Sequence, residues 1–143
     1  MDDSLFEKKP IEYQIVKRPF ENVDINLSYS FIKGCVVSHT MLNGITGLQS
    51  ILEMIYNETE TNTGALKLID YNRQIYKYRA TDGSYKKCGN DYIALTIKGL
   101  LIHILCVFMK NCKDQIIINY TMKIISELTD KKIKKILRNT SFK

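Results

Sequence analysis

The stretch from Gly64 to Cys88, GALKLIDYNRQIYKYRATDGSYKKC, decides the fold of this chain. Asp82-Gly83 separates two β-rich runs, and this pair supplies the positive φ angles that a type I′ hairpin turn needs. A third apolar run is followed by four residues that include Asp and Asn, which favour tight turns. The sequence therefore predicts a three-stranded antiparallel meander with strands at residues 66–69, 74–80 and 84–87.

The middle strand of this meander alternates in character. Lys77 and Arg79 point to one face, whereas Tyr76 and Tyr78 point to the other. A two-residue turn then brings Tyr85 onto the face of the tyrosines. So small a meander buries too little apolar surface to offset the entropy lost when its chain is ordered. Other elements must therefore cover one of its faces.

A helix is predicted from Thr46 to Asn57. Its first residues, Thr46-Gly47-Leu48-Gln49, fit a capping box, in which the threonine hydroxyl accepts a hydrogen bond from a backbone amide of the first turn. Apolar residues recur behind it at helical spacing, and we expect this stripe to lie on the meander. The members of the stripe are Leu48, Ile51, Leu52, Ile55 and Tyr56.

The least polar segment runs from Tyr92 to Met109, YIALTIKGLLIHILCVFM. A helix that is apolar all round is buried in protein or in lipid. As a helix, these about 18 residues span roughly 27 Å, which only just crosses the hydrocarbon core of a membrane. Placing Lys98 inside that core would cost about 1–3 kcal/mol on insertion scales. We therefore predict a core or subunit-interface helix, packed partly on a second copy or on the carboxyl-terminal helices; a membrane-associated helix is the alternative.

Two further helical patterns follow. The first runs from Asp114 to Leu128. Its predicted apolar stripe consists of Ile117, Tyr120, Ile124 and Leu128, widened by Ile116, Ile118, Met122 and Ile125. Thr129 then caps a short basic helix that turns Ile133, Ile136 and Leu137 inward.

The basic helix supplies the candidate nucleic-acid contacts. Lys and Arg on an exposed helical face can lie along phosphates, although a solvated face is the simpler interpretation. The absence of interleaved aromatic residues argues against base stacking there. The candidates are Lys131, Lys132, Lys134, Lys135 and Arg138, with help from Lys8, Lys9, Lys17 and Arg18.

The whole chain of 143 residues suits one compact α+β domain with extensions. We predict an amino-terminal extension at 1–23, the α+β domain at 24–110 and a helical carboxyl-terminal extension at 111–143. Weak alternation predicts an edge strand between Pro10 and Pro19. A short helix is expected within residues 26–37, followed by a packed loop.

Few residues could carry chemistry. The four cysteines form no Cys-x-x-Cys pair and no signal peptide opens the chain, which favours reduced thiols. Cys35, His39, His103 and Cys106 could hold zinc only if a loop met a helix, and a hydrogen-bonded core histidine is the expected state of His103. Because no phosphate-binding loop or nucleophile elbow is present, we expect that the protein is not an enzyme. We also expect it to bind no metal, cofactor or small-molecule substrate.

The residues from Asp24 to Leu101 resemble a domain of nucleocytoplasmic large DNA viruses of the mimivirus type. The resemblance follows the order of an apolar helix ending in Ile55-Tyr56-Asn57, a polar connector, a short strand, a basic turn and Tyr-rich strands around Asp-Gly. In that family the domain often follows a Cys/His zinc-finger segment. This chain has no such segment, and its connector lacks the family's usual Pro-Glu-Asn.

The leading expectation is a non-enzymatic viral module that associates with itself or with another protein. A nucleic-acid-binding protein that uses the basic helix is the first alternative, because the net charge is +6. A virion protein attached to a membrane through residues 92–109 is the second, although a membrane is not the expected partner. The resemblance implies a location in the host cytoplasm, at the viral factory, or in the virion.

Overall fold

A computed structural model gives the structure of the chain. It describes residues 13–18, 20, 23–28, 32–34, 36–40, 43–57, 66–80 and 82–140, and for 13–18, 23–28, 39 and 57 the description covers the backbone alone. In chain order, the elements are β1 (Tyr13–Arg18), β2 (Val23–Ser28), the π turn η1 (Val36–Thr40), the 3₁₀ turn η2 (Gly44–Thr46), α3 (Gly47–Asn57), β3 (Leu66–Asp70), β4 (Ile75–Arg79), β5 (Tyr85–Gly89), α4 (Asn90–Lys110), α5 (Gln115–Ser126) and α6 (Asp130–Asn139).

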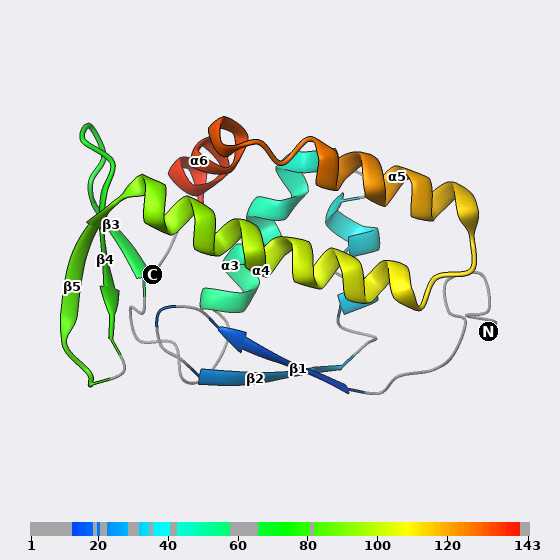
Figure 1. The fold of residues 1–143 in the computed structure, drawn as a ribbon, viewed down its shortest axis with the longest axis horizontal. Coiled ribbons are helices and arrows are strands. Elements are labelled where there is room, and N and C mark those ends of the chain that lie inside the picture. The colour runs from blue at the N-terminus through cyan, green and yellow to red at the C-terminus, as the bar shows by residue number, and fades with distance from the viewer. Residues whose placement is uncertain are drawn as a thin grey trace.

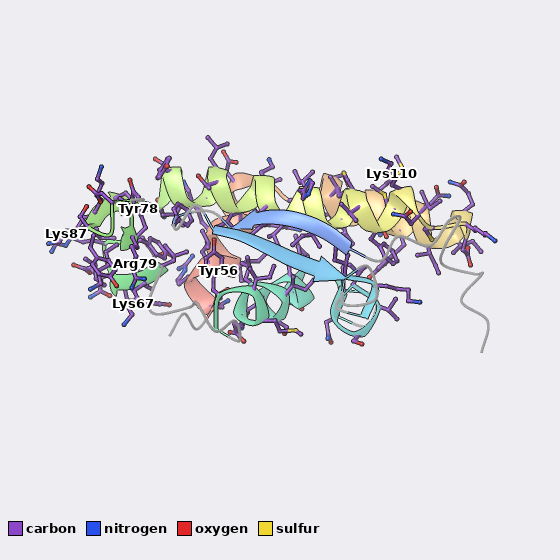
Figure 2. All side chains as sticks on the ribbon, turned by 90° about the horizontal axis from the view of Figure 1, so that it is seen from below. Tyr56, Lys67, Tyr78, Arg79, Lys87 and Lys110 are labelled. Carbon is purple, nitrogen blue, oxygen red and sulfur yellow. The ribbon has the colours of Figure 1, made fainter. Side chains whose placement is uncertain are left out.

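The predicted α+β fold is confirmed, with a three-stranded antiparallel sheet in the order β3-β4-β5. The observed strands agree with the predicted ones to within two residues. Helix α4 runs along the long axis of the molecule, with the meander at its amino-terminal end (Figure 1). Helices α5 and α6 lie on one side of α4, α3 lies beside it, and the β1–β2 hairpin lies on another side (Figures 1 and 2).

The turn between β4 and β5 is one residue longer than predicted. The amide of Ala80 donates to the Ser84 carbonyl at 2.8 Å, and the amide of Gly83 donates to the Ala80 carbonyl at 2.9 Å. These bonds close a three-residue loop with Gly83 at φ +87°, so the predicted type I′ turn is wrong. The Asp82 carboxylate accepts from the Ser84 amide at 2.9 Å and fixes the loop.

This extra residue changes the face on which Tyr85 lies. Tyr85 is paired with Arg79, and Lys86 is paired with Tyr78. Because side chains alternate along a strand, a one-residue slip moves each of them to the other face. The prediction that Tyr85 shares the tyrosine face is therefore wrong, and Tyr85 lies beside Lys77 and Arg79 instead.

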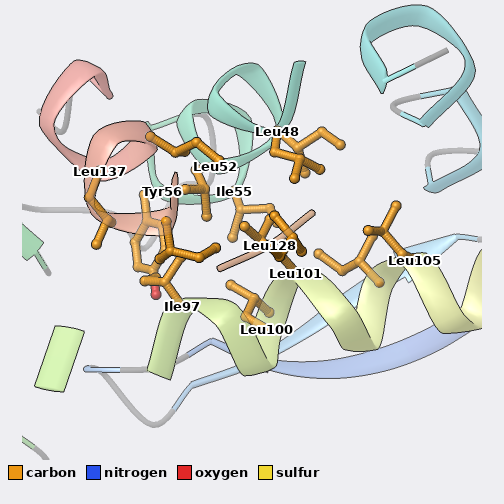
Figure 3. Close-up of a cluster of buried hydrophobic side chains, with 14 of the residues drawn as sticks. Leu48, Leu52, Ile55, Tyr56, Ile97, Leu100, Leu101, Leu105, Leu128 and Leu137 are labelled. Atoms are coloured by element: carbon orange, nitrogen blue, oxygen red, sulfur yellow. The ribbon is translucent and has the colours of Figure 1, made fainter. Parts of the chain in front are cut away.

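The core is formed mainly between helices. All five residues of the predicted α3 stripe are buried, but they face α4 and α6 rather than covering the meander (Figure 3). On α4 nine residues are buried, and Leu101 and Leu105 are completely inaccessible. The tyrosine face of the sheet packs at the start of α4, where Tyr76 is fully buried.

The predicted capping box of α3 is absent. Residues 44–46 already form the turn η2, so helical backbone begins before Thr46. The Thr46 hydroxyl donates to the Asn43 carbonyl at 2.7 Å. A residue in that position follows the start of the helical segment and does not cap it.

The amino-terminal part contains a hairpin of which only one strand was predicted. Strand β1 confirms the edge strand expected between Pro10 and Pro19, and it pairs antiparallel with β2. Residues 26–28 belong to β2, whereas the short helix expected within residues 26–37 is observed at residues 32–34. The β2 sequence VDINLS alternates apolar and polar residues over its whole length, which is the ordinary pattern of a half-buried strand.

Phe20 connects this hairpin to the meander. Its ring centroid lies 5.4 Å from that of Tyr78 and 6.1 Å from that of Tyr92, and the two tyrosines lie 5.9 Å apart. Phe20 also has a φ of +75°, which is unusual for a bulky residue. The aromatic cluster therefore holds together segments from the amino terminus, the sheet and α4.

The carboxyl-terminal helices begin where the sequence predicts. The Asp114 carboxylate accepts from the amides of Ile116 and Ile117, and the Thr129 hydroxyl accepts from the Lys132 amide at 3.3 Å. The α6 residues Ile133, Ile136 and Leu137 are buried as predicted. Two of the four residues that were predicted to widen the apolar stripe of α5 do not belong to it, because Ile116 is 80% exposed and Met122 is 56% exposed.

Candidate nucleic-acid interface

Three lysines form a row across the outer face of the meander. Lys67 pairs directly with Lys77, and Lys77 pairs directly with Lys87. Residues directly opposite each other lie on the same face, and neighbouring strands are about 4.8 Å apart. The three ammonium groups therefore gather on one surface, at the end of the molecule formed by the meander, where Lys67 and Lys87 are seen in Figure 2.

Arg79 and Tyr85 extend this row along the strands. The Arg79 guanidinium donates to the Tyr85 hydroxyl at 2.8 Å, and the Lys77 ammonium lies 4.6 Å from the centre of the Tyr85 ring. The hydrogen bond from Arg79, with the charges of Arg79, Lys77 and Lys67, lowers the pKa of Tyr85. We call Lys67, Lys77, Lys87, Arg79 and Tyr85 the basic sheet face.

The positive charge of this surface is poorly balanced within the described residues. Residues 66–89 carry a net charge of +4, out of +6 for the whole chain. Their two acids are occupied locally, because Asp70 pairs with Arg73 at 2.7 Å and Asp82 holds the hairpin loop. No described carboxylate is paired with any lysine of the row. Like charges directly opposite each other destabilise a sheet, so an anionic partner would relieve this cost.

The predicted contacts on α6 are only partly available. Lys131, Lys132, Lys135 and Arg138 are exposed, whereas Lys134 is only 31% exposed and forms an ion pair with Asp91 at the start of α4. The predicted helpers Lys8 and Lys9 lie outside the described residues, as do the side chains of Lys17 and Arg18. Lys134 thus helps to join α6 to α4, and the other four basic residues of α6 remain exposed.

The histidines and cysteines give no metal site within the described residues. His103 and Cys106 share an exposed side of α4, so the prediction of a hydrogen-bonded core histidine is wrong. Cys35 and the side chain of His39 lie outside the description. In the described part of the chain, no three His, Cys, Asp or Glu side chains are arranged to hold an ion.

The two other predicted functions, self-association and attachment to a membrane, both depend on the apolar surface of α4. Among the described helices α4 is the one long and apolar enough to cross a membrane, and half of its most apolar stretch is buried inside the protein. Its exposed apolar residues Tyr92 and Leu95 lie near its start, whereas Ile116 of α5 follows its far end. More than fifteen helical residues, about 22 Å, separate Leu95 from Ile116, so these two do not form one contiguous patch.

The chain was compared with protein-family models, curated proteins and solved structures. Nothing matches in any of the three. The resemblance to the viral domain therefore remains a prediction, and the candidate interface rests on the geometry of this chain alone.

The basic sheet face was missed because the sequence signal depends on the register. Lys67, Lys77 and Lys87 are ten residues apart, and they align only if both connections of the meander have the right length. With a two-residue turn, the row would be broken at Lys87, and Tyr85 would lie on the opposite face. That the five residues of the basic sheet face lie on one face can be recognised only when the length of the loop is known.

Proposed function

We propose that this chain is a non-enzymatic nucleic-acid-binding protein whose contact surface is the basic sheet face, with a preference for single strands. The observation that carries the proposal is the row of Lys67, Lys77 and Lys87 in direct register, next to the Arg79–Tyr85 pair. Lysines neutralise backbone phosphates and release their counterions. This use of the sheet differs from the predicted use of α6.

The preference for single strands follows from Tyr85. Tyr85 is 46% exposed, and the Lys77 ammonium and the Arg79 guanidinium lie over its ring at 4.6 and 5.4 Å from the centroid. A base that is free of a duplex can stack on such a ring, which contributes about 1–3 kcal/mol per base. Base pairs in a duplex are already stacked and do not offer this contact.

Self-association, the leading expectation from the sequence, remains a prediction. It was based on a surplus of apolar surface on α4. The carboxyl-terminal helices and α3 cover most of that surface within one chain, and the large apolar residues of α4 that stay exposed are Tyr92 and Leu95, near its start. The proposed location, in the host cytoplasm or the virion, rests on the viral resemblance.

The test measures the affinity of the full chain for a short labelled oligothymidylate at several salt concentrations. The variant Lys67→Gln/Lys77→Gln/Lys87→Gln should bind about a hundredfold more weakly near 0.1 M salt. The slope of log K against log salt should become shallower by about two, since each lost phosphate contact removes about 0.7. Tyr85→Leu should weaken binding about tenfold, whereas Tyr85→Phe retains most of the stacking.

The matched control is Lys110→Gln/Lys113→Gln/Lys123→Gln. It removes the same charge from exposed lysines of α4, α5 and their connection, and Lys110 lies at the opposite end of the molecule from Lys67 (Figure 2). We expect it to change the affinity less than threefold, through net charge alone. If both triple variants lose affinity equally, or if the wild-type chain does not bind the strand, the proposal is wrong.

A further inference from the structure

A pocket of about 210 Å³ lies between one side of α6 and the segment formed by η2 and the start of α3. Its apolar lining residues are Ile45 and Ile136, and its other lining residues are polar or charged. The lining residues are Ile45, Thr46, Gln49, Lys132, Lys135, Ile136 and Asn139. This site is separate from the basic sheet face, since none of its residues belongs to the meander.

The charge of the pocket defines the ligand. Lys132 and Lys135 are both exposed at its edge, and no acid is among the lining residues. Neither lysine is ion-paired with a described carboxylate. Two ammonium groups match a dianion, and a phosphate monoester carries about −1.5 to −2 at pH 7. An internal phosphodiester carries a single charge and fits this pair less well.

The size and the apolar lining of the pocket define the rest of the ligand. A cavity of about 150 Å³ lined by apolar residues holds benzene, so 210 Å³ accommodates a ring of nucleobase size beside Ile45 and Ile136. The amides of Gln49 and Asn139 each offer a carbonyl acceptor and an NH₂ donor to the polar edge of such a ring. An apolar lining with a few polar groups is the usual composition of a small-molecule site.

We infer that this pocket binds a phosphate monoester attached to a planar ring, as in a nucleoside monophosphate, with the phosphate held by Lys132 and Lys135. The inference does not depend on the proposed role of the sheet. The same chemistry occurs in a free mononucleotide and at the 5′-phosphorylated end of a strand. Both sources present one dianionic phosphate and one terminal base.

The experiment titrates adenosine 5′-monophosphate into the isotopically labelled full chain and follows the methyl signals of Ile45 and Ile136 by NMR. We expect saturable shifts with a Kd of about 1 mM or lower. Inorganic phosphate should bind more weakly and leave the two methyl signals almost unchanged, because it lacks the ring. The absence of saturable shifts, or equal binding of inorganic phosphate, overturns the inference.

The variant Lys132→Gln/Lys135→Gln should weaken nucleotide binding at least about tenfold, because it removes two charge-assisted contacts. Lys131→Gln/Arg138→Gln is the matched control, since it removes the same charge from the same helix outside the pocket lining. It should leave the Kd within about twofold. Equal loss in the two variants overturns the inference. All four side chains are exposed, and a thermal melt confirms that each variant is folded.

A second titration distinguishes the two sources and separates this inference from the proposed function. It uses the Lys67→Gln/Lys77→Gln/Lys87→Gln variant, in which the sheet no longer contributes, and compares 5′-phosphorylated with 5′-hydroxyl oligothymidylate. Tighter binding of the phosphorylated strand than of thymidine 5′-monophosphate assigns the pocket to strand ends; the reverse assigns it to the free nucleotide. If neither the phosphorylated strand nor thymidine 5′-monophosphate shifts the two methyl signals, the inference is wrong, whatever the sheet does.

Discussion

Two tyrosines of the meander show how strongly the two faces of one sheet differ at the residue scale. Burial raises the pKa of Tyr76 from 10.0 to about 12, whereas hydrogen bonding from Arg79 lowers the pKa of the exposed Tyr85. The Tyr76 hydroxyl is buried and has no hydrogen-bond partner among the described residues. One phenol therefore faces the protein core, and the other faces a cationic surface.

The raised pKa of Tyr76 predicts a loss of stability in alkali. The unfolded chain releases this proton near pH 10, but the folded chain keeps it until about pH 12. The contribution of Tyr76 to stability is therefore complete below pH 10 and is lost as the pH rises through about 12. In Tyr76→Phe, urea unfolding should show a smaller loss of stability between these pH values than in the wild type.

At pH 7 the same variant should be as stable as the wild type, or more stable by up to about 1 kcal/mol, because it removes an unsatisfied buried hydroxyl. Tyr71→Phe is the control, since Tyr71 is 58% exposed. The pH profile of this control should follow that of the wild type. A Tyr76→Phe profile parallel to the wild type would contradict the assignment.

At the scale of elements, the β4–β5 loop shows what a local pattern leaves open. Asp-Gly suits both a two-residue type I′ turn and a three-residue loop, because both place glycine at positive φ. The hydrogen bond from Gly83 to Ala80 selects the longer loop. The choice changes no strand, but it decides which side chains share a face with Tyr85.

A pair of glycine substitutions tests the local backbone. Gly83 has φ +87° and Gly99 lies inside α4, and an added methyl group meets no atom within 4 Å at either position. Gly83→Ala should destabilise the chain by about 1 kcal/mol, because an L-residue is strained at this φ. Gly99→Ala should stabilise it by up to about 1 kcal/mol, since alanine favours helix.

Thermal and urea unfolding of the two variants measure this difference. Both substitutions are Gly→Ala at exposed sites without steric contact. If the two substitutions change the free energy of unfolding in opposite directions, the difference comes from the backbone conformation at the two sites. A neutral Gly83→Ala variant would contradict the positive φ of Gly83.

Which elements the sequence predicts depends on the range of the interactions that form them. Helix α4 follows from a long apolar run, and α5 and α6 follow from apolar periodicity and the local caps Asp114 and Thr129. Strand β2 alternates clearly, but its partner lies in a segment with weak signals. The predicted cap of α3 is wrong because the preceding turn η2 continues into the helix, and only the observed backbone reveals this continuity.

The candidate site was less predictable than the fold for the same reason. The basic residues of α6 are contiguous in sequence and were found, although Lys134 is occupied by Asp91, which lies 43 residues earlier. The row of Lys67, Lys77 and Lys87 comes from three strands, and its alignment depends on two turns. His103 shows the converse error, because an apolar neighbourhood in sequence does not fix which helical side is covered.

At the scale of the whole molecule, α4 is the element on which the others are assembled. It contacts the meander at its start and α5 and α6 along its length. Two ion pairs, Asp91 with Lys134 and Lys98 with Asp130, also join α4 to α6. Both acids are largely exposed, so each pair contributes at most about 1 kcal/mol, and the stability comes mainly from apolar packing.

Two leucines of α4 test this arrangement. Leu101 is fully buried beneath α3, whereas Leu95 is 69% exposed. Leu101→Ala should cost about 2–5 kcal/mol, because it leaves a cavity in the core. Leu95→Ala should change the free energy of unfolding by less than about 0.5 kcal/mol. Equal costs in urea titrations would mean that α4 is oriented differently about its axis.

The lysine row has an energetic consequence that does not require a ligand. The three aligned ammonium groups repel one another while the sheet is intact and separate when the chain unfolds. Salt screens that repulsion over about 10 Å at 0.1 M, so moderate sodium chloride should raise the melting temperature of the free chain. The increase should be smaller in Lys67→Gln/Lys77→Gln/Lys87→Gln. The same ions that strengthen the empty protein would thus compete with its polyanionic partner.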